Sequence, residues 1–365
     1  MERRDFLLSS AALAAGVVWS RAASAAFEPS PENGWRTFEV THAVDVRAAE
    51  GTTRVWVPLP SVHDNAWIRP MGNLWNGNAD LVRVAREPKY GAEMLVAEWY
   101  AADAPVLEVT SRFATRDRAL GAPGKLAPRA RGGSLGRAER QLYTRATKLL
   151  PTDGIVRDTA RDITRGTRGD EAAARAIYEW IVENTFRNPE TRGCGLGDIR
   201  SMLVMGDLSG KCADLNALYV GLARAVGLPA RDVYGLRVAD SRFGYKSLGK
   251  SGDVTRAQHC RAEVWLERYG WVPVDPADVR KVVLEEEPDG LELDDPRVVD
   301  VRERLFGAWE MNWLAYNTAH DLALPGARDA TVPFLMYPQG ETDAGLLDAL
   351  DPDGFRYRIT SRELN

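Results

Sequence analysis

Alternating polar and apolar residues between Trp35 and Arg118 predict a series of β-strands. A period of two places one face of a strand in a core and the other in solvent. The pattern is present in four segments, Thr37–Val44, Thr53–Val57, Leu95–Tyr100 and Val106–Phe113. Because no 3.6-residue pattern interrupts them, we expect residues 34–118 to form a small all-β sandwich. It contains no cluster of reactive side chains, and we interpret it as a scaffold or a substrate-presenting domain.

The pattern changes after residues 119–136, which are rich in Gly, Pro and Arg and are interpreted as a linker. Helical spacing then predicts one helix over Glu171–Thr185, with Asp170 as its N-cap, and a second helix that begins near Cys212 and ends at Gly227. Strands are predicted to follow at Asp232–Val238, His259–Glu267 and Trp271–Val274. Helices followed by strands, without βαβ alternation, indicate an α+β domain over residues 137–290.

The two ends of the chain are interpreted as appendages. Residues 1–25 contain Arg3-Arg4, the apolar stretch Leu7–Trp19 and Ala23-Ser24-Ala25, which together are typical of an export signal of the twin-arginine type. The alternative is a membrane anchor, for which Leu7–Trp19 is too short. We expect a periplasmic or extracellular protein without a membrane association after signal removal. Residues 291–365 are expected to form a C-terminal extension that packs on the core or lines a cleft.

Composition narrows the choice of function without selecting one. The chain has 365 residues, of which 45% are hydrophobic and 27% are charged, as in an ordinary globular protein. Its net charge of −5 gives no electrostatic reason to expect nucleic acid as a partner. No zinc-ligand spacing, EF-hand loop or phosphate-binding glycine motif occurs, so no cofactor or metal is expected. The acidic run Glu285–Glu287 and the stretch Leu291–Asp300 are interpreted as solvated surface, with calcium binding as the alternative.

The candidate chemistry begins with a cysteine at the start of a helix. Cys212 lies in Gly210-Lys211-Cys212-Ala213-Asp214, where a predicted loop becomes a helix. The unpaired N–H groups and positive dipole end of a helix lower the pKa of a thiol at that position. The N–H of Cys212 is also placed to stabilise an oxyanion, and Gly210 is expected to let a substrate backbone approach. The alternative is a buried structural cysteine.

A reactive thiolate needs a base, and the chain has only four histidines. We expect His42 and His63 to have packing or surface roles, and we regard His320 as a weak competitor. His259 opens a predicted strand and shares one face with Arg261, whereas Cys260 points to the opposite face.

The third member of the site is expected from the next strand. Asp275 ends that strand and is positioned to orient an imidazole. A simple hairpin register brings it nearer Ala262 or Glu263 than His259, so contact with the histidine requires a bulge or a wider turn.

These three segments resemble the transglutaminase-like superfamily. The resemblance rests on Gly210–Asp214, on Gly221–Arg231 with its L-x-R-x-x-G-L-P-A-R form, on His259-x-x-x-Glu263-Val264, and on Gly270–Pro276. It covers roughly residues 140–285, and the preceding β domain looks like the N-terminal domain of bacterial members. The resemblance implies a papain-like fold and a Cys212–His259–Asp275 triad that acts on amide bonds of a protein or peptide substrate through a thioester.

Several alternatives stay open at this point. The acyl group passes to water in a peptidase or amidase and to an amine in a transglutaminase, and we favour water slightly. A non-catalytic binding protein on the same fold is the alternative function, whereas a thiol-exchange protein is disfavoured because no C-x-x-C pair occurs. Many members have an aromatic residue where this chain has Arg261, which is expected either to bind an acidic substrate or to pair with Glu263. Cys194 and Cys260 are expected as two free thiols or as a disulfide. The oligomeric state is left open.

Overall fold

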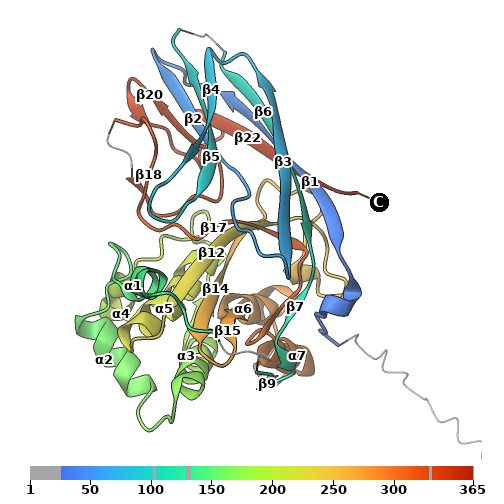
Figure 1. The fold of residues 1–365 in the computed structure, drawn as a ribbon, viewed down its shortest axis with the longest axis vertical. Coiled ribbons are helices and arrows are strands. Elements are labelled where there is room, and N and C mark those ends of the chain that lie inside the picture. The colour runs from blue at the N-terminus through green and yellow to red at the C-terminus, as the bar shows by residue number, and fades with distance from the viewer. Residues whose placement is uncertain (1–25, 102–103, 129–132, 329–330, 365) are drawn as a thin grey trace, which may run out of the picture.

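The computed structural model describes residues 26–101, 104–128, 133–328 and 331–364. It has two parts, a β-sandwich and a mixed unit in which helices surround a smaller sheet (Figure 1). The expected fold class, an α+β papain-like core preceded by a small all-β sandwich, is confirmed. The predicted export signal lies outside the described residues and stays a prediction. Within the described ranges, no helix is both long and apolar enough to cross a membrane.

Two five-stranded antiparallel sheets form the sandwich. The first sheet has the order β13 (Gly252–Asp253), β22 (Phe355–Leu364), β1 (Arg36–Val46), β6 (Val106–Thr115) and β3 (Ile68–Gly77). The second sheet has the order β21 (Gly345–Leu346), β20 (Gln339–Thr342), β2 (Thr53–Pro58), β5 (Glu93–Trp99) and β4 (Leu81–Arg86). Four of these strands match the predicted alternation.

The predicted pattern missed β3 and β4. The β3 strand is an edge strand that contains Pro70 and Gly72, and its pairing with β6 shifts register between these two residues. Proline and glycine are tolerated at edges and bulges, where fewer backbone hydrogen bonds and less packing are lost. The outer faces of both strands are largely exposed, so they lack the strong alternation that identifies half-buried strands.

The mixed unit is built on a four-stranded antiparallel sheet, which we call the central sheet. Its order is β15 (Gly270–Val274), β14 (Gln258–Leu266), β12 (Ala230–Arg237) and β17 (Trp313–Asn317). The helix α5 packs against β14 and β12. The seven helices are α1 (Arg137–Thr144), α2 (Gly154–Ile163), α3 (Asp170–Asn184), α4 (Ile199–Met205), α5 (Cys212–Ala225), α6 (Pro276–Glu285) and α7 (Pro296–Arg304) among the described residues.

Short pairs and turns connect these parts. Two-stranded pairs join β7 (Arg118–Ala119) to β16 (Ala308–Trp309), β8 (Gly121–Ala122) to β9 (Lys125–Leu126), β10 (Phe186–Arg187) to β11 (Ser209–Gly210), and β18 (Leu322–Ala323) to β19 (Thr331–Val332). The two 3₁₀ turns are η1 (Pro31–Asn33) and η2 (Lys246–Leu248). The predicted linker therefore contains strands at its start, and β7 is tied to the mixed unit through β16.

The C-terminal segment is more than the expected extension that packs on the core or lines a cleft, since it supplies strands to all three large sheets. Its strand β17 completes the central sheet, β20 and β21 extend the second sandwich sheet, and β22 is inserted between β13 and β1 in the first sheet. An open strand edge gains hydrogen bonds by pairing with any extended segment, however distant in sequence. Hydrophobic alternation carries no information about which edge is chosen, so this long-range pairing could not be predicted.

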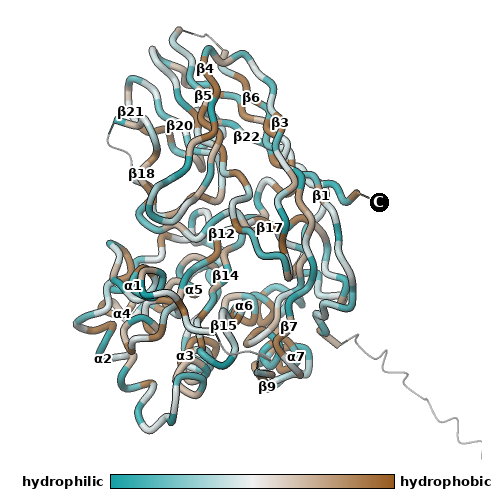
Figure 2. Tube along the Cα trace, in the orientation of Figure 1, coloured by the Kyte–Doolittle hydropathy of each residue, from teal (hydrophilic) through white to brown (hydrophobic). Residues whose placement is uncertain are grey.

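Burial on both faces explains the hydrophobic character of β5, which is visible along most of its length (Figure 2). Leu95, Ala97 and Trp99 face the sandwich interior, whereas Met94 and Val96 belong to a second cluster. That second cluster includes Leu322, Leu324 and Leu335, so the C-terminal segment covers the outer face of the second sheet. The sandwich thus depends on the end of the chain for its edges and for one covering layer.

We predict that Ile359→Ala destabilises the protein much more than Arg356→Ala, although both residues lie on β22. Ile359 is fully buried in the large core shared by the two parts, whereas Arg356 is exposed. Deleting buried methyl groups costs about 2–5 kcal/mol, while exposed substitutions stay within about 0.5 kcal/mol. Urea unfolding followed by tryptophan fluorescence measures both changes. Equal midpoints for the two variants would show that β22 is not part of the folded core.

Candidate active site

The helix α5 begins at Cys212, as predicted, and presents its first turn to a cleft. Cys212 is 4% exposed, so its sulfur is accessible only from that cleft. The N–H groups of Ala213, Asp214 and Leu215 are bonded to backbone carbonyls of Cys194 and Lys211. The N–H of Cys212 has no acceptor among the described residues, so it is free to bind an oxygen atom of a substrate.

A single carboxylate holds the segment before Cys212 in place. Asp214 accepts hydrogen bonds from the N–H groups of Lys211 at 2.9 Å, Leu196 at 3.0 Å and Gly197 at 2.9 Å. A Cβ atom at Gly210 or Gly195 would lie 2.5 or 1.8 Å from its Oδ2 atom. The expectation for Gly210 is therefore corrected, because this glycine makes room for Asp214 rather than for a substrate backbone.

The structure brings His259 and Asp275 together. The Nε2 atom of His259 lies 2.7 Å from Oδ2 of Asp275, and both residues are buried. Asp275 is also the N-cap of α6, where its Oδ1 atom accepts from the N–H of Asp278 at 3.1 Å and from Nδ2 of Asn216 at 3.2 Å. The carboxylate is thereby oriented by three donors, and Nδ1 of His259 is left for Cys212.

No bulge is needed for this contact, contrary to the expectation from the hairpin register. Val274 pairs with Ala262, so the next position, Asp275, falls beside Arg261 in the β14–β15 pair. Residues two positions apart on a strand share a face, so a side chain beside Arg261 reaches His259 diagonally. The contact therefore depends on side-chain reach across a regular pair of strands.

A second carboxylate, Asp278, was missed by the sequence reasoning. Its Oδ1 atom lies 3.3 Å from Nε2 of His259 and 2.5 Å from a guanidinium nitrogen of Arg237. Burial opposes the charge of Asp278, but Arg237 and His259 outweigh it and hold the pKa of this carboxyl well below its usual range. The spacing Asp275-x-x-Asp278 at a helix start, typical of a capping box, was the available signal.

Arg261 has neither of its two expected roles. It is 2% exposed, donates to the carbonyl of Glu310 at 2.9 Å, and places its Nε atom 3.4 Å from Oδ2 of Asp275. Its guanidinium lies over the ring of Trp313. Glu263 instead pairs with Arg118 and Arg231, each at 2.7 Å. Arg261 therefore supports the acid behind His259 and does not face the cleft.

These charges set the protonation state of His259. Burial alone would lower the pKa of the imidazole, and Arg237 acts in the same direction. The negative charges of Asp278 and Asp275 outweigh both and raise the pKa of His259 to about 9. The histidine is therefore protonated at neutral pH, which suits it to stabilise a neighbouring thiolate.

All three cysteines of the chain gather at this position as free thiols. Hydrogen bonds from the thiols of Cys194 and Cys260 are the largest influences on Cys212; burial opposes them, and His259 adds to them. Together they hold the pKa of Cys212 well below its usual range. Cys212 and then burial raise the pKa of Cys194, whereas burial and then Cys212 raise the pKa of Cys260. In the structure the thiol of Cys194 donates to the carbonyl oxygen of Gln258 at 3.7 Å. Cys194 and Cys260 are both free thiols, so the alternative of a Cys194–Cys260 disulfide is not what the structure contains.

The remaining histidines lie elsewhere. His42 is buried and bonded to the hydroxyl of Tyr316 at 3.1 Å, and burial lowers its pKa to about 4. His63 bonds to Asn65 near the surface at 3.3 Å. His320 pairs with Asp232 at 3.2 Å. None of these contacts involves Cys212.

One group of residues has the spacing of a metal site. Ligand atoms of His259, Asp275 and Asp278 lie within 4.8 Å of one another. Two guanidinium groups, those of Arg237 and Arg261, already pair with these carboxylates and oppose the approach of a cation.

The carboxylates of the acidic run Glu285–Glu287 also have partners within the protein. Glu285 pairs with Arg187, Glu286 accepts from two N–H groups and Glu287 pairs with Arg297.

Comparisons with known proteins concern the family and the fold of this chain. A family model described as the transglutaminase-like superfamily matches residues 157–276, which include Cys212, His259 and Asp275. An uncharacterised protein of Haemophilus influenzae is 35% identical over 345 residues, or 90% of this chain and 91% of the relative. A candidate cysteine protease from Cytophaga hutchinsonii has the same fold, with a TM-score of 0.56 at 12% identity over 91% of this chain and 92% of that one.

A weaker likeness links the chain to the periplasmic domain of TgpA from Pseudomonas aeruginosa, at 17% identity over 63% of this chain and 88% of that one. The TM-score of this match is 0.33. The family match, the relative and the shared fold are sufficient: the chain belongs to the transglutaminase-like superfamily.

We predict that Cys194→Ala raises the pKa of Cys212 by about one to two pH units, because a hydrogen bond to a charged group contributes about 1.5–3 kcal/mol. Cys194→Ser, which keeps an O–H donor of similar size, is the matched control and should preserve most of the low pKa. The measurement is the pH profile of Cys212 alkylation by iodoacetamide, resolved by peptide mass spectrometry. Identical alkylation profiles for Cys194→Ala and Cys194→Ser would show that Cys194 does not act as a hydrogen-bond donor to Cys212.

Proposed function

We propose that this protein is a cysteine-dependent amide hydrolase or acyltransferase with Cys212 as nucleophile, His259 as acid and base, and Asp275 as the orienting carboxylate. The observation that carries the proposal is the 2.7 Å bond between His259 and Asp275 beside Cys212, which opens α5 on one side of a cleft that Cys212 and His259 both line. A nucleophile, its base and an orienting group in this order are the arrangement that covalent amide chemistry requires.

The first half of the reaction forms a thioester. The Cys212 thiolate attacks the carbonyl carbon of the substrate, and the resulting oxyanion accepts a hydrogen bond from the N–H of Cys212 at the positive end of α5. His259, protonated at neutral pH, gives its Nδ1 proton to the leaving nitrogen as the C–N bond breaks. The amine departs, and the acyl group stays on the sulfur.

The second half releases the acyl group. Neutral His259 removes a proton from water or from an acceptor amine as that nucleophile attacks the thioester, and collapse of the intermediate regenerates the thiolate and the imidazolium. Asp275 keeps Nε2 of the ring bonded throughout, so Nδ1 always faces the sulfur. We favour water as the acceptor, because an exported enzyme meets bulk water and excluding it requires an enclosed site.

We predict that Cys212→Ala abolishes turnover of amide substrates, and that Asp275→Asn lowers kcat by about 10³–10⁴-fold, because the amide no longer holds the imidazole in its charged, correctly oriented form. Turnover is measured with a library of fluorogenic peptide amides, and the acyl-enzyme is detected as a mass increase on the Cys212 peptide after an acid quench. His320→Ala, which changes a buried histidine that contacts Asp232, is the matched control for loss of an imidazole.

Addition of a primary amine to the same assay separates the two reaction types. Faster decay of the acyl-enzyme with formation of the new amide indicates acyl transfer, whereas unchanged decay to the free acid indicates hydrolysis. A wild-type Cys212 that forms no acyl-enzyme with any library member, although it is alkylated at low pH, would favour the alternative of a binding protein on this fold.

A further inference from the structure

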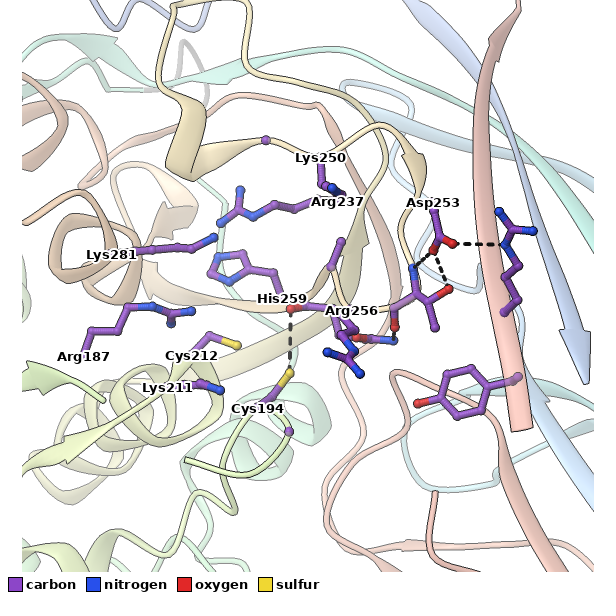
Figure 3. Close-up of a pocket in the computed structure, with 17 residues that line it drawn as sticks. Arg187, Cys194, Lys211, Cys212, Arg237, Lys250, Asp253, Arg256, His259 and Lys281 are labelled. Carbon is purple, nitrogen blue, oxygen red and sulfur yellow. Dashed lines mark hydrogen bonds and ion pairs between the residues drawn. The ribbon is translucent and has the colours of Figure 1, made fainter. Parts of the chain in front are cut away.

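The cleft beside Cys212 is strongly basic in a protein of net negative charge. It has a volume of about 660 Å³, and seven Lys or Arg residues line it against one carboxylate outside the triad, that of Asp253. The whole chain carries a net charge of −5, so the basic lining does not follow from its composition. Six of the basic side chains lie around Cys212 and His259 in Figure 3: Arg187, Lys211, Arg237, Lys250, Arg256 and Lys281. The seventh, Arg358, lines the same cleft from β22 of the sandwich.

Two of these cations each pair with a carboxylate of their own. Arg237 pairs with buried Asp278, and Arg358 pairs with Asp253 at 3.0 Å. Lys211, Lys250 and Arg256 form no ion pair with a carboxylate in the part of the chain that the structure describes. Lys250 and Arg256 are exposed, and Lys211 is the N-cap of α5 next to the nucleophile. The cleft therefore keeps an excess of positive charge after its internal pairs are counted.

The inner wall of the cleft has two cations that share one acid. Arg187 and Lys281 both pair with Glu285, and their side chains are only 13% and 18% exposed. Figure 3 shows both pointing toward His259. Burial first, and then the charge of Arg237, lower the pKa of Lys281 to about 8. An ammonium group that is destabilised by a neighbouring cation is stabilised when an anion binds beside it.

We propose that this cleft selects acyl donors that carry carboxylates close to the scissile amide, that is, acidic peptides. Arg187 and Lys281 bind a carboxylate beside the reacting carbonyl, and the exposed Lys250 and Arg256 add positive charge along the rest of the cleft. The proposal rests on the proposed function, since a carbonyl must reach Cys212, and this requirement favours a peptide over a nucleic acid. The carboxylates come either from Asp or Glu side chains or from a free peptide terminus.

A pair of small alkylating reagents tests the charge of the cleft without any turnover. Iodoacetate and iodoacetamide react with the same thiolate but differ by one negative charge. The ratio of their rates therefore cancels any change in the pKa of Cys212. At pH 7 and low salt, we expect the iodoacetate-to-iodoacetamide ratio for Cys212 to exceed that of N-acetylcysteinamide by at least about tenfold, and to fall as salt is added.

Substitutions identify the residues responsible. We expect Lys281→Gln and Arg187→Gln each to lower the ratio by about threefold or more. Arg256→Gln should also lower the iodoacetate-to-iodoacetamide ratio. Arg256 is exposed and pairs with no carboxylate of the described residues, so this variant keeps the test valid if an inner variant does not fold. Arg157→Gln, on the exposed surface of α2, is the matched control and should leave the ratio unchanged. A wild-type ratio equal to that of the free thiol would overturn the proposal.

A peptide series then separates the two proposals and the two sources of carboxylate. Matched peptides carry Glu or Gln on either side of the scissile amide, each with a free or an amidated C-terminus. Preference for Glu indicates side-chain recognition, and preference for the free terminus indicates recognition of the α-carboxylate. Faster turnover of the neutral peptides overturns the acidic-substrate proposal but supports the proposed enzymatic function. A high reagent ratio with no turnover of any peptide overturns the proposed function and leaves an anion-binding cleft.

Discussion

The carboxylate of Asp275 holds together the elements that form the candidate site. One oxygen atom caps α6 and accepts from Asn216 of α5, and the other accepts from His259 of β14. Arg261 approaches the same oxygen from behind, and Asp275 itself follows β15 directly. A buried carboxylate without these partners would be costly, so the positions of α5, α6 and β14 are mutually constrained.

The surroundings of that carboxylate form an unusually charged interior. Asp278, Arg237, Arg261 and His259 are all buried within bonding distance of one another or of Asp275. Each charge lies beside an opposite one, and removing either carboxylate would leave its cationic partners buried with less compensation. The same arrangement raises the pKa of His259. His259 then adds to the larger influence of Cys194 and Cys260, which lower the pKa of Cys212.

The sandwich and the mixed unit are joined through the end of the chain and are not consecutive domains. The strand β22 pairs with β1 and β13, and its residues Tyr357 and Arg358 line the cleft beside Cys212. Leu322, Leu324, Val332 and Leu335 cover the outer face of the second sandwich sheet before the chain returns. The sandwich that we interpreted as a scaffold therefore contributes directly to the wall of the candidate active site.

The sequence by itself determined the elements near Cys212 and the candidate residues of the site. Helix and strand periodicity located α3, α5, β12, β14 and β15, and short motifs identified Cys212, His259 and Asp275, because these depend on local residue order. Tertiary structure decided what depends on contacts between distant segments. It placed Cys194 and Cys260 against Cys212, directed Arg261 toward Asp275, and gathered a basic lining from six separate segments. It also returned β22 to the sandwich, because edge pairing and charge compensation are set by proximity in space and leave no period in the sequence.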